Sequence, residues 1–296
     1  MENVTYVNIE NHEVAIKNLA KVYSDKGRVL KGEVIEYYVK IAPLILPHIH
    51  NKPFSMIHFP DGESGKSFYQ KQCPREAPAW LKTVSLKSSV KGSIDWCLVN
   101  DTASMVYMAN RGVIEMHTWF SRLPDLTAPD MAVIDLDPSG DTGFKEAVYI
   151  ARVFRSVLEQ LNVYSVPKTS GGRGLHICIP VKNADFNRVQ EFLKHICISV
   201  AATYPQRATM ERSVIKRGDK IYLDAVQNAQ GKTITAPYSL RARPHIPVST
   251  PLEWDELLSD TLMPADFTIR NIFARISEKG DLLKDFYKKA QELPKF

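Results

Sequence analysis

Two carboxylates, Asp135 and Asp137, lie near the end of an apolar segment, MAVIDLDP (131–138), that Pro138 terminates. On an extended strand, residues i and i+2 point to the same face and lie about 6.5–7 Å apart. Two anions at this spacing repel each other unless a positive charge lies between them or water surrounds them. The motif alone is compatible with a cation site and with a solvated strand end. Other parts of the sequence are needed to distinguish these two interpretations.

A third acid, Asp224, ends another segment with strand-like alternation, DKIYLDAVQN (219–228). Asp224 shares one face with Lys220 and Tyr222, and apolar residues occupy the other face. Three carboxylates on strands can hold two divalent cations for in-line transfer of a nucleotidyl group. Oxygen ligands favour Mg²⁺ or Mn²⁺ over zinc. A polar loop that begins at Asp224 is the alternative, and the spacing alone leaves both interpretations open.

A glycine-rich turn lies in the segment KTSGGRGLHICIPV (168–181). Its three glycines allow backbone N–H groups to converge on an anion. Ser170 adds a hydroxyl, Arg173 a planar set of donors, and His176 begins the next predicted strand. The segment matches neither the P-loop nor the dinucleotide-binding pattern. It predicts a turn that binds a triphosphate.

Basic residues recur downstream in TAPYSLRARPHIPV (235–248) and in SVIKRGDK (213–220). Arg241 and Arg243 are predicted to share one face of an extended segment, where two guanidinium groups can clamp phosphates. Arg217 adds a further cation close to Asp224 in the sequence. A solvated basic loop is the alternative in both places.

Four strings in fixed order, IDLDP, SGGRGLH, YLDAVQN and TAPYSLRARP, resemble the polymerase domain of bacterial and archaeal ligase D. That domain belongs to the archaeo-eukaryotic primase superfamily and acts in non-homologous end joining. The resemblance runs from LAKVYSDKGRVLKGEVIEYY to KGDLLKDF, which is nearly the whole chain. It implies a template-dependent nucleotidyltransferase that fills gaps or extends ends at DNA breaks, prefers ribonucleotides and uses two Mn²⁺ or Mg²⁺ ions with a nucleoside triphosphate substrate.

The resemblance also assigns residues. The catalytic metal ligands would be Asp135, Asp137 and Asp224. The nucleotide would be contacted by His117, Ser170, Arg173, His176, Arg217, Gln227, Arg241 and Arg243. DNA would be contacted by Lys21 and Lys31, which match a pair that binds a 5′-phosphate, and by Phe68 and Tyr69, which match an aromatic pair, one ring of which stacks on a template base. A basic loop around Lys87 and Lys91 matches a segment implicated in bringing two DNA ends together.

Two departures from the family pattern are visible. Many relatives carry Lys where this chain has Arg173, which keeps the charge. Some relatives carry a basic residue where this chain has Ile57 and His58, so one nucleotide contact is in question.

Other functions remain open beside the polymerase. A primase would begin chains without a primer, and a DNA-end-bridging scaffold would serve a Ku/ligase complex without chemistry. A phosphatase with Asp135 as nucleophile would need a hydroxyl residue at a set position after the acidic pair. The third acid favours the polymerase over both the scaffold and the phosphatase.

The periodicity of the chain predicts an α/β (α+β) fold. Helices are expected at 12–23, at 31–49 with a break near Pro43, at 102–112, 143–161, 186–204 and in the tail 278–296. Strands are expected at 52–59, twice within 84–99, and at 113–120, 131–138, 174–181 and 220–226. Several connections are too short for helical crossovers, which favours an antiparallel-rich, mixed sheet flanked by helices.

With the resemblance, these elements form one primase-polymerase catalytic domain over 1–296. Residues 1–80 would be an N-terminal helical and strand part that contributes the 5′-phosphate and template contacts.

The composition is compatible with this function without establishing it. The chain has 38 Lys and Arg against 33 Asp and Glu, a net charge of +5, which permits a polyanionic partner. Its four cysteines lack C-x-x-C spacing, so reduced thiols are expected rather than a zinc site or disulfides. Neither a signal sequence nor a membrane-spanning segment is evident, which predicts a cytoplasmic, nucleoid-associated protein. With no ligase segment in the chain, the expected partners are gapped or 3′-overhanging DNA with a 5′-phosphate, a Ku-like protein and a separate ligase.

Overall fold

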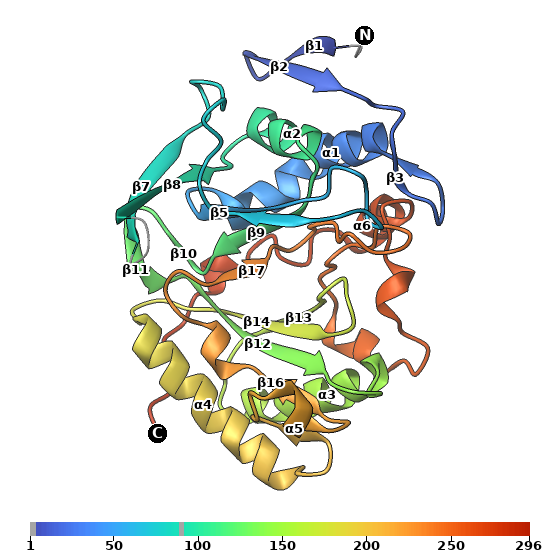
Figure 1. The fold of residues 1–296 in the computed structure, drawn as a ribbon. Coiled ribbons are helices and arrows are strands. Elements are labelled where there is room, and N and C mark those ends of the chain that lie inside the picture. The colour runs from blue at the N-terminus through green and yellow to red at the C-terminus, as the bar shows by residue number, and fades with distance from the viewer. Residues whose placement is uncertain (1–3, 89–91) are drawn as a thin grey trace. The chain divides into compact units, whose positions relative to one another are not determined.

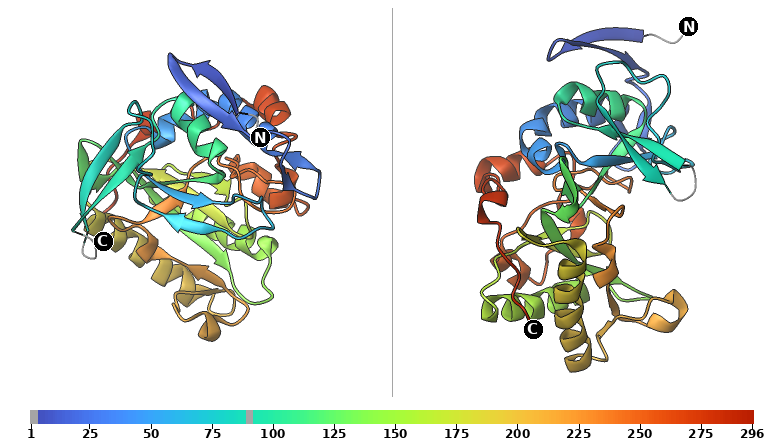
Figure 2. Two further views of the ribbon diagram at one scale, coloured as in Figure 1. Left: turned by 45° about the horizontal axis from the view of Figure 1, so that its top comes forward. Right: turned by 90° about the vertical axis from the view of Figure 1, so that its left-hand side faces the viewer.

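The computed structural model describes residues 4–88 and 92–296, and the chain divides into two compact units. The first unit comprises Met1–Trp119, Thr233–Val248 and Phe267–Ile272. The second unit comprises Phe120–Lys232, Ser249–Asp266 and Phe273–Phe296. Each unit has its own central sheet and helices (Figures 1 and 2). Assignment of one catalytic domain to 1–296 remains a prediction.

The first unit is built on a six-stranded antiparallel sheet with the order β17-β9-β5-β8-β7, in which β6 also pairs with β5. Its strands are β5 (Pro53–His58), β6 (Phe68–Gln70), β7 (Thr83–Ser88), β8 (Gly92–Leu98), β9 (Val113–Trp119) and β17 (Thr233–Thr235). Two helices, α1 (Lys31–Ile49) and α2 (Thr102–Asn110), pack against each other over this sheet (Figure 1). Large apolar side chains such as Phe54 and Ile45 are fully buried in its core.

The second unit is built on a five-stranded mixed sheet with the order β13-β14-β12-β16-β15, in which only β15 and β16 run parallel. Its strands are β12 (Met131–Pro138), β13 (Val166–Thr169), β14 (Leu175–Pro180), β15 (Ala208–Thr209) and β16 (Ile221–Leu223). The helices α3 (Phe144–Gln160) and α4 (Phe186–Thr203) pack against strands of this sheet and against each other. The predicted antiparallel-rich α+β fold is therefore confirmed.

Shorter elements complete the chain. Two-stranded ladders are formed by β1 (Val4–Ile9) with β2 (His12–Lys17), β3 (Val22–Ser24) with β4 (Val29–Leu30), and β10 (Ser121–Arg122) with β11 (Asp125–Pro129). The remaining helices are α5 (Val214–Arg217), α6 (Ile272–Lys279) and the 3₁₀ turns η1 (Ala225–Gln227), η2 (Trp254–Leu258), η3 (Pro264–Asp266) and η4 (Tyr287–Lys289). Within residues 4–88 and 92–296, no helix is long and apolar enough to cross a membrane.

The predicted helix at 12–23 was wrong, because this segment contains strands β2 and β3. The residues between β1 and β2, Glu10 and Asn11, both have positive φ values, of 50° and 67°. A two-residue hairpin turn of this kind matches the twist of its flanking strands. Val14 and Ile16 are buried at alternate positions, as a strand with one covered face requires.

Two further predictions about helices were wrong. Helix α1 continues through Pro43 and Pro47, although each proline removes a helical hydrogen bond. Side chains along the whole helix, including Tyr37 and Tyr38, are buried, and this packing holds the helix together on both sides of the prolines. The predicted tail helix is absent, because positive φ at Gly280 follows the end of α6 and the chain beyond has only the turn η4.

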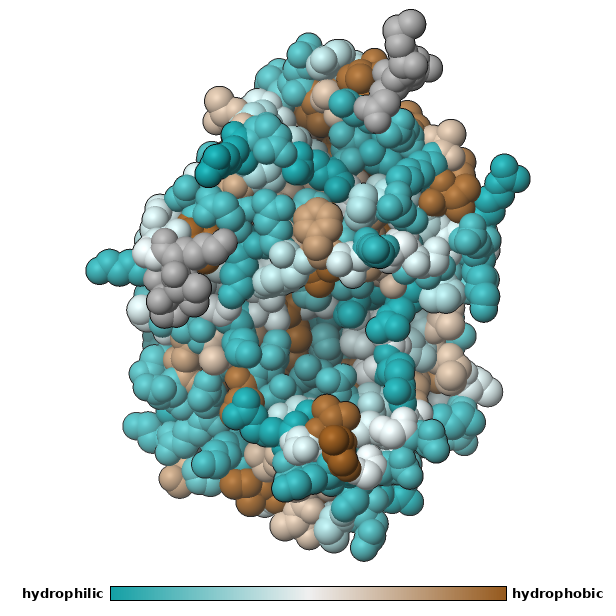
Figure 3. Space-filling view, viewed as in Figure 1, coloured by the Kyte–Doolittle hydropathy of each residue, from teal (hydrophilic) through white to brown (hydrophobic). Residues whose placement is uncertain are grey.

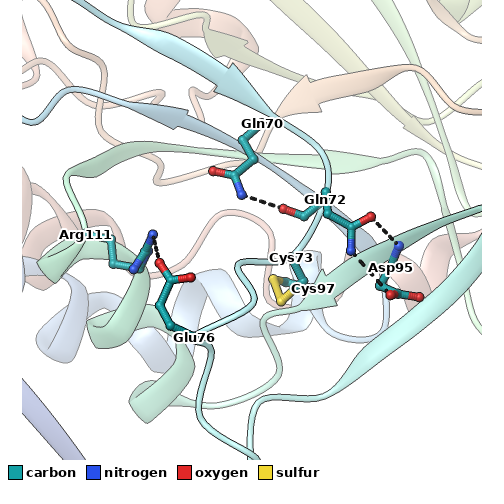
Figure 4. Close-up of a disulfide and its surroundings, with 7 residues drawn as sticks. All are labelled: Gln70, Gln72, Cys73, Glu76, Asp95, Cys97 and Arg111. Atoms are coloured by element: carbon teal, nitrogen blue, oxygen red, sulfur yellow. Dashed lines mark hydrogen bonds and ion pairs between the residues drawn. A yellow bond between two sulfur atoms is a disulfide. The ribbon is translucent and has the colours of Figure 1, made fainter. Parts of the chain in front are cut away.

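The prediction of four reduced thiols was wrong for Cys73 and Cys97, which form a disulfide within the first unit (Figure 4). Their Cα atoms lie 5.2 Å apart. Hydrogen bonds join the same two segments, the residues after β6 and strand β8. Cys73 N donates to Asp95 O at 2.6 Å, and Asp95 N donates to Gln72 Oε1 at 3.1 Å. The two cysteines are separated by 24 positions, so no local motif reveals the pair.

Candidate active site

The three predicted metal ligands lie on one face of the second unit's sheet. Strand β12 pairs with β16 so that Leu136 is opposite Leu223 and Asp137 is opposite Tyr222. Asp224 N donates to Asp135 O at 3.2 Å, which continues this register and sets the two acids opposite each other. Because cross-strand partners and residues i and i+2 share a face, all three carboxylates point to the same side.

Two basic side chains extend the same cross-strand row. His176 on β14 is the register partner of Asp135, and its Nε2 lies 3.4 Å from Asp135 Oδ1. Lys168 on β13 is the register partner of His176, is only 1% exposed, and donates from Nζ to Ser249 Oγ at 2.6 Å. Sequence reasoning missed Lys168, although it begins the segment that carries the glycine-rich turn.

The donors available at this face fit a divalent cation with a preference for oxygen ligands, because all three are carboxylates. Asp224 already uses Oδ1 to accept hydrogen bonds from Val226 N at 3.1 Å and Gln227 N at 3.0 Å, which caps η1. Across the described residues, no three His, Cys, Asp or Glu side chains form a ready-made metal cluster.

The glycine-rich turn is organised by the hydroxyl of Ser170. Ser170 Oγ accepts hydrogen bonds from Gly172 N at 3.1 Å and from Gly174 N at 3.2 Å, and Gly171 has a φ of 71°. Ser170 N also donates to Gly174 O at 3.1 Å. The sequence between β13 and β14 therefore forms a tight, hydrogen-bonded turn beside the acidic row.

Arg173 ties this turn to the segment that follows the acids. Its Nη2 donates to Gly140 O at 2.9 Å and to Thr142 O at 2.7 Å. The guanidinium therefore connects the two loops that emerge from neighbouring strands β14 and β12. An anion bound at the turn would contact a cation that the fold already holds in place.

Gly174 is required by the close approach of β14 to β12. A Cβ at this position would lie 2.5 Å from Leu136 O and 3.3 Å from Asp137 Oδ1. We expect Gly174→Ala to lower the free energy of unfolding by about 1–3 kcal/mol and to displace Asp137. Urea unfolding checks this, with Gly143→Ala as the matched control because a Cβ there meets nothing within 4 Å. Equal stability of the two variants would contradict a steric requirement for glycine at position 174.

Arg217 and Gln227 lie on either side of β16. Arg217 folds back on its own loop, where Nε donates to Glu211 O at 2.9 Å, Nη2 donates to Arg212 O at 3.1 Å, and the guanidinium lies 3.6 Å from the centre of the Tyr222 ring. Since Tyr222 is the partner of Asp137, the base of this loop lies beside the acids.

In the first unit, a buried carboxylate that sequence reasoning missed organises two predicted nucleotide contacts. Glu115 and His117 share one face of β9, and His117 Nε2 lies 2.8 Å from Glu115 Oε2. Arg241 Nε lies 3.1 Å from the same oxygen, and Ala242 N donates to Glu115 Oε1 at 3.1 Å. Arg241 Nη1 also donates to Thr235 Oγ1 at 2.9 Å. The sequence signal was available in IEMHTW, where the acid precedes the histidine by two positions.

The pKa of Glu115 reflects these contacts. Burial alone would raise the pKa of the carboxyl group, but the hydrogen bond with His117, the charges of Arg241 and His117, and the N–H of Ala242 lower it to about 2. Glu115 is therefore charged at neutral pH and fixes the orientation of His117 and Arg241.

Arg243 does not share a face with Arg241, so that prediction was wrong. The segment turns here, with Arg243 N donating to Arg241 O at 2.9 Å and His245 at a φ of 66°. Arg241 is partly buried against Glu115, whereas Arg243 is exposed. The proline after Arg243 favours this turn over an extended segment.

The predicted 5′-phosphate pair, Lys21 and Lys31, is brought together at the start of α1. Lys31 N donates to Lys21 O at 2.8 Å, and β3 and β4 connect the two residues. Lys21 Nζ lies 2.6 Å from Asp61 Oδ1, and Lys31 is buried. Exposed Lys87 lies on β7, whereas Lys91 lies outside the described residues.

The predicted aromatic pair is displayed on strand β6. Phe68 and Tyr69 are 53% and 51% exposed, so both rings are accessible to a partner. The Phe68 ring stacks on the buried His58 with centroids 4.5 Å apart, and Tyr69 Oη lies 2.8 Å from Ser55 Oγ. Each ring is therefore supported from β5, as a stacking surface requires.

The chain is similar to proteins of known function. The family model described as the primase-polymerase domain of LigD matches residues 30–283. The bifunctional non-homologous end joining protein LigD of Bacillus subtilis is 31% identical over 298 residues, which covers 98% of this chain and 48% of that protein. The multifunctional LigD of Mycolicibacterium smegmatis is 30% identical and is matched over 93% of this chain and 36% of its own length. This chain thus spans about half or less of these relatives.

Among solved structures, the polymerase domain of Mycobacterium tuberculosis Ligase D in complex with DNA superposes with a TM-score of 0.86. The two chains are 26% identical, and the match covers 94% of this chain and 99% of the other.

Proposed function

Since the chain belongs to the family of LigD primase-polymerase domains, we propose that it is a template-dependent polymerase that fills gaps or extends DNA ends during non-homologous end joining. The observation that carries this proposal is the row of three acids on one sheet face beside a hydrogen-bonded glycine turn and a fixed arginine. This combination of oxygen ligands and anion-binding groups is what nucleotidyl transfer from a triphosphate requires.

The second unit's residues have distinct proposed roles. Asp135, Asp137 and Asp224 would hold two Mn²⁺ or Mg²⁺ ions, which when bound acidify the attacking hydroxyl and neutralise the leaving pyrophosphate. Ser170, Arg173 and His176 would contact the triphosphate, and Ser170 Oγ also keeps the turn in shape by accepting hydrogen bonds from Gly172 N and Gly174 N. Arg217 and Gln227, on either side of β16, would add contacts to the nucleotide.

The first unit's residues are proposed to bind nucleotide and DNA. His117, Arg241 and exposed Arg243 would contact the nucleotide, with Glu115 orienting the first two. One ring of the pair Phe68 and Tyr69 would stack on a template base. The preference for ribonucleotides and the participation of a Ku-like protein and a DNA ligase are proposed from the family, since the relatives are named as end joining proteins.

The experiment that tests this function is extension of a labelled primer by one nucleotide in a gapped duplex. We expect extension with Mn²⁺ or Mg²⁺, faster addition of ribonucleotides than of deoxynucleotides, and no synthesis on a template without a primer. Synthesis without a primer would identify a primase instead. Binding of DNA with no addition under any of these conditions would overturn the polymerase and favour the end-bridging scaffold.

Recognition of the downstream 5′-phosphate gives a separate prediction. Replacing the 5′-hydroxyl of the gap by a 5′-phosphate is expected to tighten DNA binding, and Lys21→Gln is expected to remove about fivefold of that gain. Because Lys21 contributes one positive charge, the gain in DNA affinity that it provides is expected to fall as the salt concentration rises. Fluorescence anisotropy measures the dissociation constant of the gapped DNA, and Lys40→Gln, at an exposed position on α1, is the control. If both variants respond alike to the 5′-phosphate, Lys21 has no part in binding it.

A further inference from the structure

Two consecutive apolar side chains are exposed on the short helix α5. Val214 is 69% exposed and Ile215 is 95% exposed, so neither contributes to the core. The loop that carries α5 projects from the other elements of its unit, and an apolar group stands among hydrophilic ones at this position (Figures 2 and 3). Adjacent apolar side chains that project in this way are available for contact with a partner.

The loop is held in a defined conformation. The Arg217 side chain donates to the carbonyl groups of Glu211 and Arg212, and Ser213 N donates to Glu211 Oε1 at 2.8 Å. Stacking of Arg217 on Tyr222 anchors the base of the loop to β16. Ile215 is therefore presented outward by a preorganised support, which lowers the entropic cost of a contact.

The surroundings favour DNA as the partner. Segment 211–220 carries four basic residues against two acidic ones, and Arg212 and Lys216, which flank the apolar pair, are exposed. The base of the loop lies beside Asp137, because Tyr222 is the register partner of that acid. DNA whose reacting end lies at the acids would pass close to this loop, and its phosphates would be complementary in charge to the basic flank.

We propose that Ile215, supported by Val214, is an apolar contact for the DNA that is bound at the acidic row, packing against exposed base or sugar surface while Arg212 and Lys216 contact phosphates. This inference rests on the proposed function, because it takes DNA as the substrate. Apolar side chains that pack against bases supplement phosphate contacts in many DNA-binding proteins. The contribution of the apolar contact to the free energy of DNA binding is independent of salt, whereas the contribution of the phosphate contacts weakens as salt rises.

The test is the dissociation constant of a labelled gapped duplex, measured without nucleotide at several salt concentrations. Ile215→Ser is expected to weaken binding about tenfold at every salt concentration, with an unchanged slope of log Kd against log salt. Lys216→Gln is expected to reduce that slope by about 0.9. Ile215→Leu keeps an apolar side chain and is expected to remain within about twofold of the wild type. Ile198→Ser, 49% exposed on α4, is the matched control for loss of a surface isoleucine.

The outcomes separate this inference from the proposed function. Three results would each overturn the proposed contact. Ile215→Ser could bind the duplex as tightly as the wild type, Ile198→Ser could lose as much affinity as Ile215→Ser, or the wild type could fail to bind the duplex. Because no catalysis is needed, a chain that binds DNA through Ile215 but never extends a primer would refute the polymerase and leave the contact standing.

Discussion

Asp137→Asn is expected to lower the rate of single-nucleotide addition by at least about a thousandfold, because it removes a charged ligand from the row on which both proposed metal ions depend. Asp137 is exposed and shares its sheet face with Asp135 and Asp224. In the metal-free protein these carboxylates repel one another, so the same variant is expected to unfold at an equal or higher urea concentration than the wild type. Loss of activity with retained stability is the signature of a functional acid cluster.

Asp260→Asn provides the control, because Asp260 is a surface acid of the same unit whose side chain is 95% exposed. It is expected to keep wild-type addition. Single-turnover extension with saturating nucleotide measures the rate, and urea unfolding without metal measures the stability. Addition by Asp137→Asn within tenfold of the wild type would remove this residue from the metal site.

Glu115→Gln is expected to raise the KM for the nucleotide by about tenfold or more, because His117 and Arg241 lose the charge that orients them. It is also expected to lower the free energy of unfolding at pH 7 by about 3 kcal/mol, since a partly buried arginine is left without its counterion. Glu36→Gln is the control, because Glu36 is an exposed acid of the same unit that pairs with Lys40 at the surface. Nucleotide titrations and urea unfolding measure the two effects.

The stability difference between wild type and Glu115→Gln should depend on pH. The pKa of Glu115 is about 2 in the folded protein, against 4.5 for an unperturbed glutamate. A carboxyl group whose pKa is lowered by folding contributes stability above its unfolded pKa. The difference is therefore expected to be full above about pH 4.5 and to shrink as pH falls toward 2. A difference that stays constant over this range would show that the charge of Glu115 contributes nothing.

The sequence predicted the second unit better than the first. Strands 131–138 and 174–181 and helices 143–161 and 186–204 were expected within one or two residues of their observed bounds, because each has an unbroken apolar period. The shared face of Asp135 and Asp137 followed from strand 131–138, since alternation fixes which residues share a face, whereas the position of Asp224 beside them depended on the pairing of β12 with β16. Their pairing could not be predicted, because register depends on contacts between distant segments.

The failures have local physical causes. The hairpin β1–β2 depends on a turn in which Glu10 has positive φ, an unusual conformation for glutamate, so Asn11 was the one turn-favouring residue of the pair. The role of Glu115 depends on Arg241, which lies 126 positions later, so no local pattern in the sequence reveals that the two residues pair. The disulfide of Cys73 and Cys97 likewise depends on a fold that brings β8 beside the segment after β6.

The most direct test of the central claim is to measure pyrophosphate release together with primer extension. The wild type is given a gapped duplex with each of the four template bases in turn and one nucleotide at a time. We expect one pyrophosphate per nucleotide added, addition governed by complementarity to the template base, and neither product with Asp137→Asn. Release of phosphate without extension, or addition that ignores the template base, would contradict a template-dependent polymerase.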